Sequence, residues 1–378
     1  MKNNKVFQFH SLTREVQCQH TIISMVLLDA VAGLLLGIGL QHLALSPALT
    51  LWLSCGLGFT VVFLLRLVCG CYSFRRLRPE GAVFVTGCDS GMGEETALKL
   101  VGEGYDVFAG CYSEASFEKL REKCRERNRK VGDKKLHPVQ IDVTSDSSVQ
   151  EAVALVREQV QERGLIGVIN CAGLGYCGPC EYFPLDLYEK QIQVNLIGYI
   201  RVTQAFMPLV REATSVKGSR QGRLIFIGTG GGVPSACPPL LSAYMASKWG
   251  GDAFCQSLRI EMQLRKYNID ACLINPGFIK PTQLASVGER LLQETWKKMP
   301  PQASEEYKEW VDKFLKFSEE QPGTHVSKIG EAMVEAMSAP KPLLRYRVGF
   351  DSKASPIVGL LPTSWREWIL RKSMFNAP

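Results

Sequence analysis

Two long apolar runs occupy the N-terminal part of the chain. They are Thr21 to Leu40 and Leu49 to Val68. Each is about 20 residues long, which at ~1.5 Å rise per residue is enough to span the ~30 Å hydrocarbon core of a bilayer. A cleaved signal peptide fits poorly, because the polar stretch before the first run is long and a second run follows directly. We therefore expect a membrane anchor over residues 21–72, with spans at about 21–40 and 49–68, preceded by a tail over residues 1–20.

Charge predicts the orientation of this anchor. Basic residues lie before the first run and after the second, whereas the connection "QHLALSPA" has no Lys or Arg. The basic residues are Lys2, Lys5, Arg14, Arg75, Arg76 and Arg78. The positive-inside rule then predicts a transmembrane helical hairpin with both ends in the cytosol. Asp29 lies in the first run, and placing its charge near the centre of a span would cost roughly 2.5 to 3.5 kcal/mol of insertion free energy. A single span therefore stays open as the alternative to two.

After the basic stretch the pattern changes to short apolar runs that alternate with helical periodicity. Ala82 to Val85 predicts a buried strand, three glycines then mark a tight turn, and Asp106 to Gly110 predicts the next strand. "LHPVQIDVT", "GLIGVINCAG", "GRLIFIGTGGG" and "IDACLINPG" are further strand candidates, separated by helical stretches such as Ser147 to Arg163. Repeated βα units predict an α/β fold: a Rossmann-type, doubly wound parallel sheet with helices on both faces, preceded by the transmembrane hairpin.

The turn between the first two predicted strands carries candidate chemistry. Gly87, Gly91 and Gly93 stand between a strand and a helix, where backbone must come close to a pyrophosphate at a helix N-terminus. A glycine triplet alone indicates only a turn, but a preceding strand, a following helix and the next strand about 20 residues on favour dinucleotide binding.

Composition and charge exclude several other classes of protein. The 378 residues are 46% hydrophobic with 34 glycines, as in an α/β protein, and the net charge of +7 comes from basic residues mixed with acids. We therefore expect no nucleic-acid partner. The 13 cysteines are odd in number and scattered through apolar runs, which indicates reduced thiols. With five histidines and no ligand-spaced cluster, we expect no metal.

One short stretch suggests a different chemistry. Cys177-Gly-Pro-Cys180 has the spacing of a thioredoxin-type redox motif, which needs a helix N-terminus and a small βαβ context to activate its first thiol. Here the motif follows the fourth predicted strand instead. A Gly-Pro turn flanked by two buried thiols is therefore favoured over a thiol oxidoreductase, and a regulatory disulfide stays open as a hypothesis.

Five motifs in order give the chain a resemblance to the short-chain dehydrogenase/reductases, across roughly Gly81 to Thr282. The family's T-G-x-x-x-G-x-G is matched by Thr86 to Gly93, and its Y-x-x-x-K by Tyr244 to Lys248. Its strand-end acid, helix asparagine and P-G pair are matched by Asp142, Asn195, Pro276 and Gly277. The phrases "TGCDSGMG", "VFAGC" and "RGLIGVIN" look most like the branch with retinol, hydroxysteroid and 3-hydroxybutyrate dehydrogenases.

The resemblance implies an acid–base role for Tyr244. A phenol has a pKa near ~10, and Lys248, one helical turn away, can stabilise the tyrosinate while its ammonium binds the nicotinamide ribose. By the family mechanism Tyr244 removes the alcohol proton during oxidation or donates it during reduction. Asn195 would hold a water in the proton relay.

Two positions depart from the family pattern. Thr229 stands where the family has a serine, and the loop from Thr229 to Tyr244 is longer than usual, so Ser235 and Ser242 are alternative hydroxyl donors. Thr229 keeps a hydroxyl that can orient the substrate oxygen, although its branched side chain can aim that hydroxyl differently. Cys171 replaces the second asparagine of the family's N-N-A-G. These departures motivate a pseudoenzyme alternative, a dinucleotide-binding sensor or scaffold.

The expected cofactor is NAD, with NADP the less favoured alternative. The second strand ends in "GCYSE", with no Arg or Lys there or in the glycine turn to bind a 2′-phosphate. The catalytic candidates are Tyr244, Lys248, Asn195 and Thr229. The cofactor-binding candidates are Thr86, Gly87, Asp89, Ser90, Gly91, Met92, Gly93, Cys111, Asp142, Val143, Asn170, Ala172, Gly173, Tyr244, Lys248, Pro276 and Gly277.

The remaining sequence completes the domain plan. We expect the Rossmann domain over residues 78–350, a helical substrate lid at about 285–320 and a C-terminal tail over 351–378. The tail carries Trp365 and Trp368 beside arginines, and it fits an interfacial amphipathic helix and a tail packed on the core equally well.

The resemblance implies a membrane-anchored oxidoreductase that transfers hydride between NAD(H) and a lipophilic alcohol or ketone of the retinoid or steroid kind. A 3-hydroxybutyrate-type dehydrogenase is a further alternative. The expected partners are a lipophilic small molecule and a membrane. We expect this membrane to be that of the endoplasmic reticulum, with the catalytic domain on its cytosolic side. A homodimer stays open.

Overall fold

The structure, a computed structural model, describes residues 80–129, 132–215, 221–230, 237–281, 283–375 and 377, with the backbone alone given for 283–289. The chain divides into two compact units, Met1–Phe74 and Arg75–Pro378, and the described residues belong to the second. The predicted N-terminal tail and both predicted spans lie outside the described residues. Among the described helices, none combines the length and the apolar character needed to cross a bilayer.

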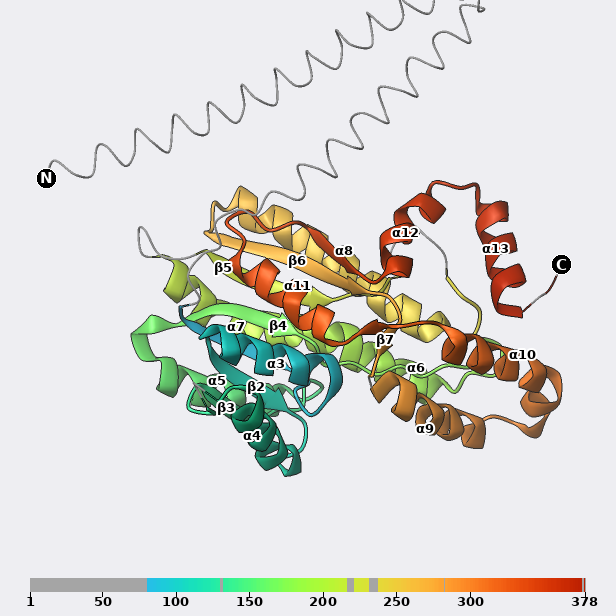
Figure 1. Cartoon of the computed structure of the whole chain (residues 1–378), viewed down its shortest axis with the longest axis horizontal. Coiled ribbons are helices and arrows are strands. Elements are labelled where there is room, and N and C mark those ends of the chain that lie inside the picture. Colours follow the sequence, from blue (N-terminus) through green and yellow to red (C-terminus); the bar gives the residue numbers. More distant parts are fainter. Residues whose placement is uncertain are drawn as a thin grey trace, which may run out of the picture. The chain divides into compact units, whose positions relative to one another are not determined.

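A seven-stranded parallel sheet forms the centre of the described unit (Figure 1). Its strand order is β3-β2-β1-β4-β5-β6-β9, and each neighbouring pair is parallel. The order reverses between β1 and β4, which opens a crevice at the carboxyl ends of these two strands. The predicted doubly wound sheet is confirmed. The strands are β1 (Ala82–Thr86), β2 (Asp106–Cys111), β3 (Leu136–Gln140), β4 (Leu165–Asn170), β5 (Gly222–Ile227), β6 (Ile269–Pro276) and β9 (Arg345–Val348).

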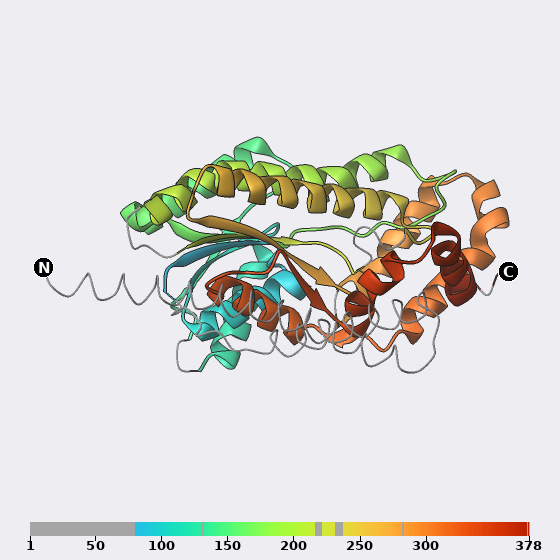
Figure 2. The ribbon, with the colours of Figure 1, turned by 90° about the horizontal axis from the view of Figure 1, so that it is seen from above.

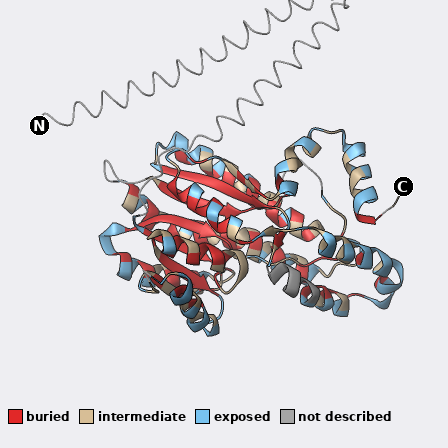
Figure 3. Cartoon of the chain, viewed as in Figure 1, coloured by how far each residue is buried: buried red, intermediate tan, exposed pale blue. Residues whose placement is uncertain are grey.

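Helices cover both faces of this sheet, as Figure 2 shows. Helices α3 (Gly91–Glu103), α4 (Ala115–Arg127) and α11 (Ser327–Ser338) contribute to one apolar core. Helices α5 (Asp146–Val160), α7 (Gly198–Ser215) and α8 (Ser242–Leu264) contribute to the other. Figure 3 shows the resulting burial of the sheet and of the inward helix faces. Central strands such as β1 are buried throughout, because a parallel sheet covered on both faces has no solvent side.

Aromatic packing fixes α7 on its face of the sheet. The ring of Phe206 stacks on that of Phe84 in β1, with 4.1 Å between the ring centroids. Burying a side chain of this size contributes about 1.5–3 kcal/mol. This packing sets the position of α7 and of the residues that precede it, which approach the crevice.

The other elements follow the carboxyl ends of β4, β6 and β9 and gather at one end of the sheet (Figure 1). A small parallel pair, β7 (Ile279–Lys280) and β8 (Thr324–His325), joins them. The helical elements there are α6 (Leu185–Ile192), the π-turn η2 (Gln193–Ile197), α9 (Gln283–Lys298), α10 (Pro301–Glu320), α12 (Phe350–Gly359) and α13 (Thr363–Phe375), whereas the short η1 (Gln161–Arg163) lies between α5 and the start of β4.

An apolar cluster, which we name the lid cluster, holds these outer elements together. Its buried residues come from the loop after β4, the loop before α8, and helices α9, α10 and α13. The C-terminal helix takes part through its last residues, since the rings of Trp310 and Phe375 lie 5.1 Å apart, whereas Trp365 and Trp368 are exposed. The lid cluster is Cys177, Leu240, Leu292, Val311, Met374 and Phe375.

Candidate active site

The turn between β1 and α3 brings three backbone segments very close together. Gly87 has a φ of 71°, and a Cβ there would lie 2.7 Å from the Cα of Ala172 in the loop after β4. A Cβ at Gly93 would overlap the carbonyl oxygen of Gly87. Side chains are therefore excluded where a pyrophosphate would meet the N-terminus of α3.

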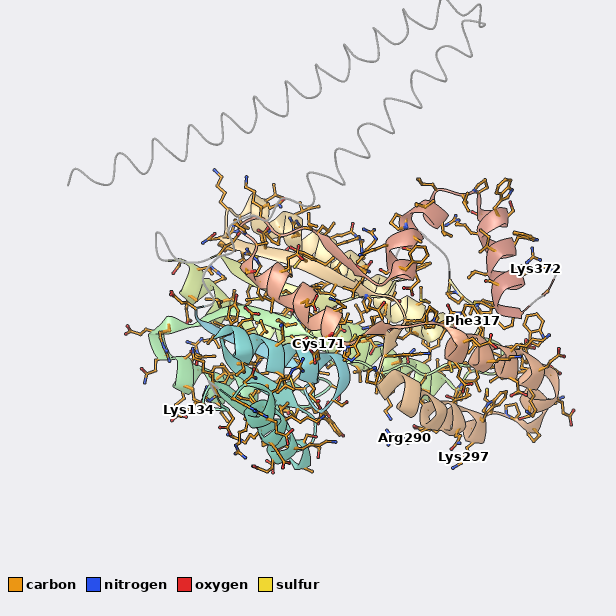
Figure 4. The ribbon with its side chains drawn as sticks, viewed as in Figure 1. Lys134, Cys171, Arg290, Lys297, Phe317 and Lys372 are labelled. Atoms are coloured by element: carbon orange, nitrogen blue, oxygen red, sulfur yellow. The ribbon has the colours of Figure 1, made fainter. Side chains whose placement is uncertain are left out.

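The carboxyl ends of β1 and β4 are also joined directly. The hydroxyl of Thr86 accepts hydrogen bonds from the amides of Cys171 and Ala172, at 3.0 and 3.1 Å. Cys171 lies in the interior of the molecule beside α3 (Figure 4), and burial raises the pKa of its thiol to about 12. Cys171 therefore serves as a small neutral core residue at the position where the family has a second asparagine.

Asp89 connects the glycine turn to the loop after β2. Its carboxylate accepts hydrogen bonds from the amides of Tyr112 and Ser113, at 2.9 and 3.0 Å, and from the hydroxyl of Ser116 at 2.9 Å. A pocket of about 470 Å³ opens beside this loop. The described residues that line it are Tyr112, Ser113, Glu114, Ala115, Gln140, Asp142 and Ser148.

The remaining cofactor candidates contribute in different ways. Asp142 lines the pocket, and its carboxylate accepts bonds from the amide and hydroxyl of Thr144. Val143 and Cys111 are buried in the two cores, and their contact with a cofactor stays a prediction. Asn170 donates to the hydroxyl of Thr203 at 3.1 Å, and its buried side-chain oxygen has no partner among the described residues.

Gly277, of the predicted P-G pair, lies at the carboxyl end of β6. Its amide donates to the carbonyl of Val348 at 2.8 Å, and a Cβ there would overlap the carboxylate of Asp351. Glycines at the turns, an open α3 N-terminus and an adjoining pocket fit the pyrophosphate, ribose and adenine of a dinucleotide.

Helix α8 carries Tyr244 and Lys248 one turn apart, facing the end of β5. Burial raises the pKa of Tyr244 to about 12, and the side chain of Thr229 has a smaller, opposing effect on it. Lys248 is buried, and this lowers its pKa to about 8, against the opposing effects of Cys171 and Asp252. The Lys248 amine lies 5.9 Å from the centroid of the Tyr244 ring.

Of the hydroxyl alternatives, the structure brings Thr229 to Tyr244, while Ser235 lies outside the described residues. Ser242 is described at the first turn of α8, and no contact between it and Tyr244 is found among the described residues. Thr229 therefore acts on Tyr244 despite the longer loop, and its role in orienting the substrate oxygen stays a prediction.

Asn195 lies in the π-turn η2 and connects the loop after β4 to α8. Its side-chain oxygen accepts from the amide of Leu174 at 2.8 Å, and its amide group donates to the Leu174 carbonyl at 2.9 Å and to Ser247 Oγ at 3.0 Å. Ser247 Oγ in turn donates to the carbonyl of Tyr244 at 2.7 Å. Both amide hydrogens are used within the protein, so the side chain of Asn195 serves first as a clamp, and the water-holding role stays a prediction.

Sequence reasoning missed two groups around Lys248. Tyr199 on α7 accepts a hydrogen bond from the Lys248 amine at 2.9 Å. Asp252, one turn beyond Lys248 on α8, is buried and paired with Arg345 of β9. Asp252 follows Lys248 at the i, i+4 spacing that places side chains on one helix face, whereas no spacing in the sequence links Tyr199 to Lys248.

The Cys-Gly-Pro-Cys stretch lies at the opposite, lid side of the site. Cys177 is buried in the lid cluster, where burial raises the pKa of its thiol to about 12, while Cys180 is exposed. The next helix, α6, begins only at Leu185, so no helix N-terminus activates Cys177. Within the described residues, no group of three His, Cys, Asp or Glu side chains could hold a metal ion.

A glycine turn at the switch point of a doubly wound sheet, with a Tyr-Lys pair beside it, defines a dinucleotide-dependent oxidoreductase. The family profile described as "short chain dehydrogenase" matches residues 81–290. The chain belongs to the short-chain dehydrogenase/reductase family and is an NAD(P)-dependent enzyme acting on alcohol groups.

Relatives of known name support this assignment. Human retinol dehydrogenase 5 is 32% identical over 77% of this chain and 89% of its own length. Bovine 17-beta-hydroxysteroid dehydrogenase type 6 is 31% identical, over 77% and 88%. Among solved structures, levodione reductase aligns with a TM-score of 0.57 at 22% identity, over 74% of this chain and 99% of its own, which supports the fold.

Proposed function

We propose that this enzyme interconverts a lipophilic alcohol and its ketone or aldehyde, of the retinoid or steroid kind, with NAD(H), from a membrane-anchored position. The observation that carries the proposal is the Lys248 amine 5.9 Å from the ring centroid of buried Tyr244, whose pKa the Thr229 side chain lowers, together with an apolar lid cluster. The names of the related retinol and hydroxysteroid dehydrogenases support the substrate class.

The cofactor, when bound, supplies the hydride acceptor or donor. The glycine turn after β1 and the loop after β4 would hold it, with Asp89 and Asp142 near the pocket at the ends of β2 and β3. For alcohol oxidation, the Oη of Tyr244 accepts the hydroxyl proton of the substrate; for reduction it donates that proton. Burial outweighs the opposing effect of Thr229 and leaves the pKa of Tyr244 at about 12, too high for a base. The Thr229 hydroxyl and a positive charge on Lys248 both favour the tyrosinate.

Apolar side chains support a lipophilic substrate. Leu240 of the lid cluster lies in the loop before α8, four residues before Tyr244, and helices α9, α10 and α13 bring Leu292, Val311 and Phe375 to the same cluster. Phe317 extends from α10 in the same part of the molecule, whereas Arg290 and Lys297 project from the outside of α9 (Figure 4). A hydrophobic alcohol would exchange water for these surfaces on binding.

Charge near the pocket favours NAD over NADP. The carboxylate of Asp89 lies against the backbone of Tyr112 and Ser113, and Glu114 lines the same pocket. None of the described lining residues is Lys or Arg. A 2′-phosphate would meet negative charge without a basic partner, while a ribose hydroxyl would find carboxylate acceptors.

The test is turnover by the full chain in detergent, followed by NADH fluorescence with retinol, steroid alcohols and 3-hydroxybutyrate, each offered with NAD and with NADP. We expect activity with a lipophilic alcohol and NAD. Thr229→Ser, which restores the family residue, should keep most of it, and Thr229→Ala should lose it by roughly 10- to 100-fold. Turnover of 3-hydroxybutyrate alone would move the assignment to that class.

Membrane anchoring rests on residues 21–40 and 49–68 and has its own test. In cells that express the full chain, we expect the protein to remain in the membrane pellet after alkaline carbonate extraction. Protease added to intact microsomes should degrade the catalytic domain, because basic flanks place both ends of the anchor in the cytosol. Release by carbonate, or protection of the domain, would refute the anchor or its orientation respectively.

A further inference from the structure

A second tyrosine lies against the amine of Lys248. Tyr199 comes from α7 and is 1% exposed. The Lys248 amine donates to the Tyr199 hydroxyl at 2.9 Å and lies 5.1 Å from the centroid of its ring. Lys248 thus lies between two phenols, of which only Tyr244 belongs to the motif.

The hydrogen bonds define which atom donates to which. The Tyr199 hydroxyl donates to the carbonyl of Ile227 at 3.3 Å, and the Lys248 amine donates to the same carbonyl at 3.0 Å. A phenol has one hydrogen, so with that hydrogen on Ile227 the Tyr199 oxygen has lone pairs for Lys248. Burial also raises the pKa of Tyr199 well above its usual value. Tyr199 is therefore a neutral acceptor and does not compete with Tyr244 as a base.

The other titratable groups around Lys248 do not accept a hydrogen bond from its amine. Cys171, beyond the end of β4, is a neutral thiol, and Asp252, on α8 itself, is already paired with Arg345 of β9. Arg347 of the same strand acts on Asp252 as a further positive charge. The oxygens that directly receive the Lys248 amine, among the described residues, are the Tyr199 hydroxyl and the Ile227 carbonyl.

We propose that Tyr199 is a positioning residue, whose hydroxyl oxygen holds the Lys248 amine in its charged form and fixes it beside Tyr244. Charged donors make hydrogen bonds about twice as strong as neutral ones, so the contact favours the ammonium over the amine. The contact is a hydrogen bond seen in the structure. Its effect on turnover rests on the proposed function, because a charged Lys248 affects proton transfer only through Tyr244.

The first test follows Lys248 in the protein without cofactor. Formaldehyde with cyanoborohydride methylates the neutral amine, and mass spectrometry of the peptide that contains Lys248 gives the rate at each pH. Tyr199→Phe keeps the ring and removes the acceptor. We expect methylation of Lys248 at pH 7 to be about fivefold faster than in the wild type, because a pKa of about 8 that falls by one unit raises the neutral fraction of the amine from about 9% to about 50%.

Tyr346→Phe is the matched control. Tyr346 is also buried, and its hydroxyl accepts a hydrogen bond from the amide of Leu343 at 3.1 Å, on the edge strand β9. It should leave the methylation of Lys248 unchanged. Equal rates in wild type and Tyr199→Phe would overturn the proposal. If the phenylalanine variant does not fold, as judged by its melting curve, 3-fluorotyrosine at position 199 weakens the acceptor in place and should give a smaller change in the same direction.

The second test is the pH profile of turnover. In Tyr199→Phe the loss of activity at alkaline pH should begin about one unit lower, because Lys248 loses its charge earlier. A purely structural role would lower activity equally at every pH. Faster methylation without any alcohol turnover in the wild type would uphold the contact and count against the proposed function, so the two failures are distinguishable.

Discussion

The proposed cofactor side and the proposed substrate side of the site are built in different ways. On the cofactor side, backbone segments meet directly: Gly87 allows the turn after β1 to approach the loop after β4, Gly93 allows α3 to approach the same turn, and Thr86 hydrogen-bonds to the loop after β4. On the substrate side, the lid cluster is made of side chains from helices far apart in the sequence. Backbone geometry of this kind depends on glycine at fixed positions, whereas apolar packing tolerates exchange.

The two sides also differ in charge. Lys248, Asp252 and Arg345 lie together in or near the protein interior beside the cofactor side, while the lid cluster consists of apolar side chains and one neutral thiol. Buried charged residues lower the stability of the fold and are retained because the chemistry needs them, whereas buried apolar residues raise it. Substitutions on the two sides should therefore change different measured quantities.

The largest effect should come from Tyr244→Phe, which lies where the two sides meet. Removing the acid–base hydroxyl should lower turnover by roughly 10²- to 10⁴-fold, while the dissociation constant for NADH, followed by fluorescence, stays within about twofold because no cofactor-binding backbone moves. Tyr267→Phe, at a half-buried tyrosine after α8, is the control and should behave as wild type. Turnover that survives in Tyr244→Phe would refute the role of this residue.

Lys248→Met tests the cost of buried charge. The pKa of Lys248 is lowered from 10.5 to about 8, so between these pH values the unfolded chain holds a proton that the folded protein has lost, and wild-type stability rises with pH. The methionine variant lacks this contribution. The stability of the variant relative to wild type should therefore fall by roughly 3 kcal/mol as pH rises from below 8 to above 10.5. Denaturant unfolding at several pH values measures it; parallel pH dependences would show that Lys248 does not carry the buried charge.

Gly93→Ala tests the backbone side alone. The new Cβ would overlap the carbonyl oxygen of Gly87, so the turn must open, and we expect NADH to bind about 100-fold more weakly, a cost of roughly 2.7 kcal/mol. The control is Gly251→Ala on α8, where a Cβ would meet the Tyr199 ring at an ordinary 3.8 Å. Normal NADH affinity in a folded Gly93→Ala protein would contradict the assignment of this turn to the cofactor.

The same difference explains what could be predicted from sequence. The glycine turn, six of the seven sheet strands and the Tyr244–Lys248 pair are encoded in short stretches whose spacing carries the signal. Strand β9 was missed because it is a short edge strand in which Arg345 and Arg347 alternate with buried residues, unlike the continuous apolar runs of the central strands. Its role, to bring Arg345 to Asp252, depends on a contact between distant parts of the chain.

The contact of Tyr199 with Lys248 could not be predicted for a similar reason. The spacing from Asn195 to Tyr199 places both side chains on one helix face, but it does not reveal that this face meets Lys248 of α8. The lid cluster adds a further case. The sequence indicated helices at 285–320, while the inclusion of Met374 and Phe375 from the end of the chain follows only from how α10 and α13 pack.

The smallest effect should come from Phe375→Leu in the lid cluster, and it gives the most direct test of the difference between the two sides. Leucine keeps most of the buried volume, so we expect a cost below about 1.5 kcal/mol in stability and about a threefold rise in KM for a lipophilic alcohol. The dissociation constant for NADH should not change. Phe350→Leu, at an almost fully exposed position of α12, is the matched control. If Phe375→Leu weakened NADH binding and left KM unchanged, the lid cluster would belong to the cofactor side. The packing of the lid cluster and the backbone of the glycine turn would then both act on the binding of NADH.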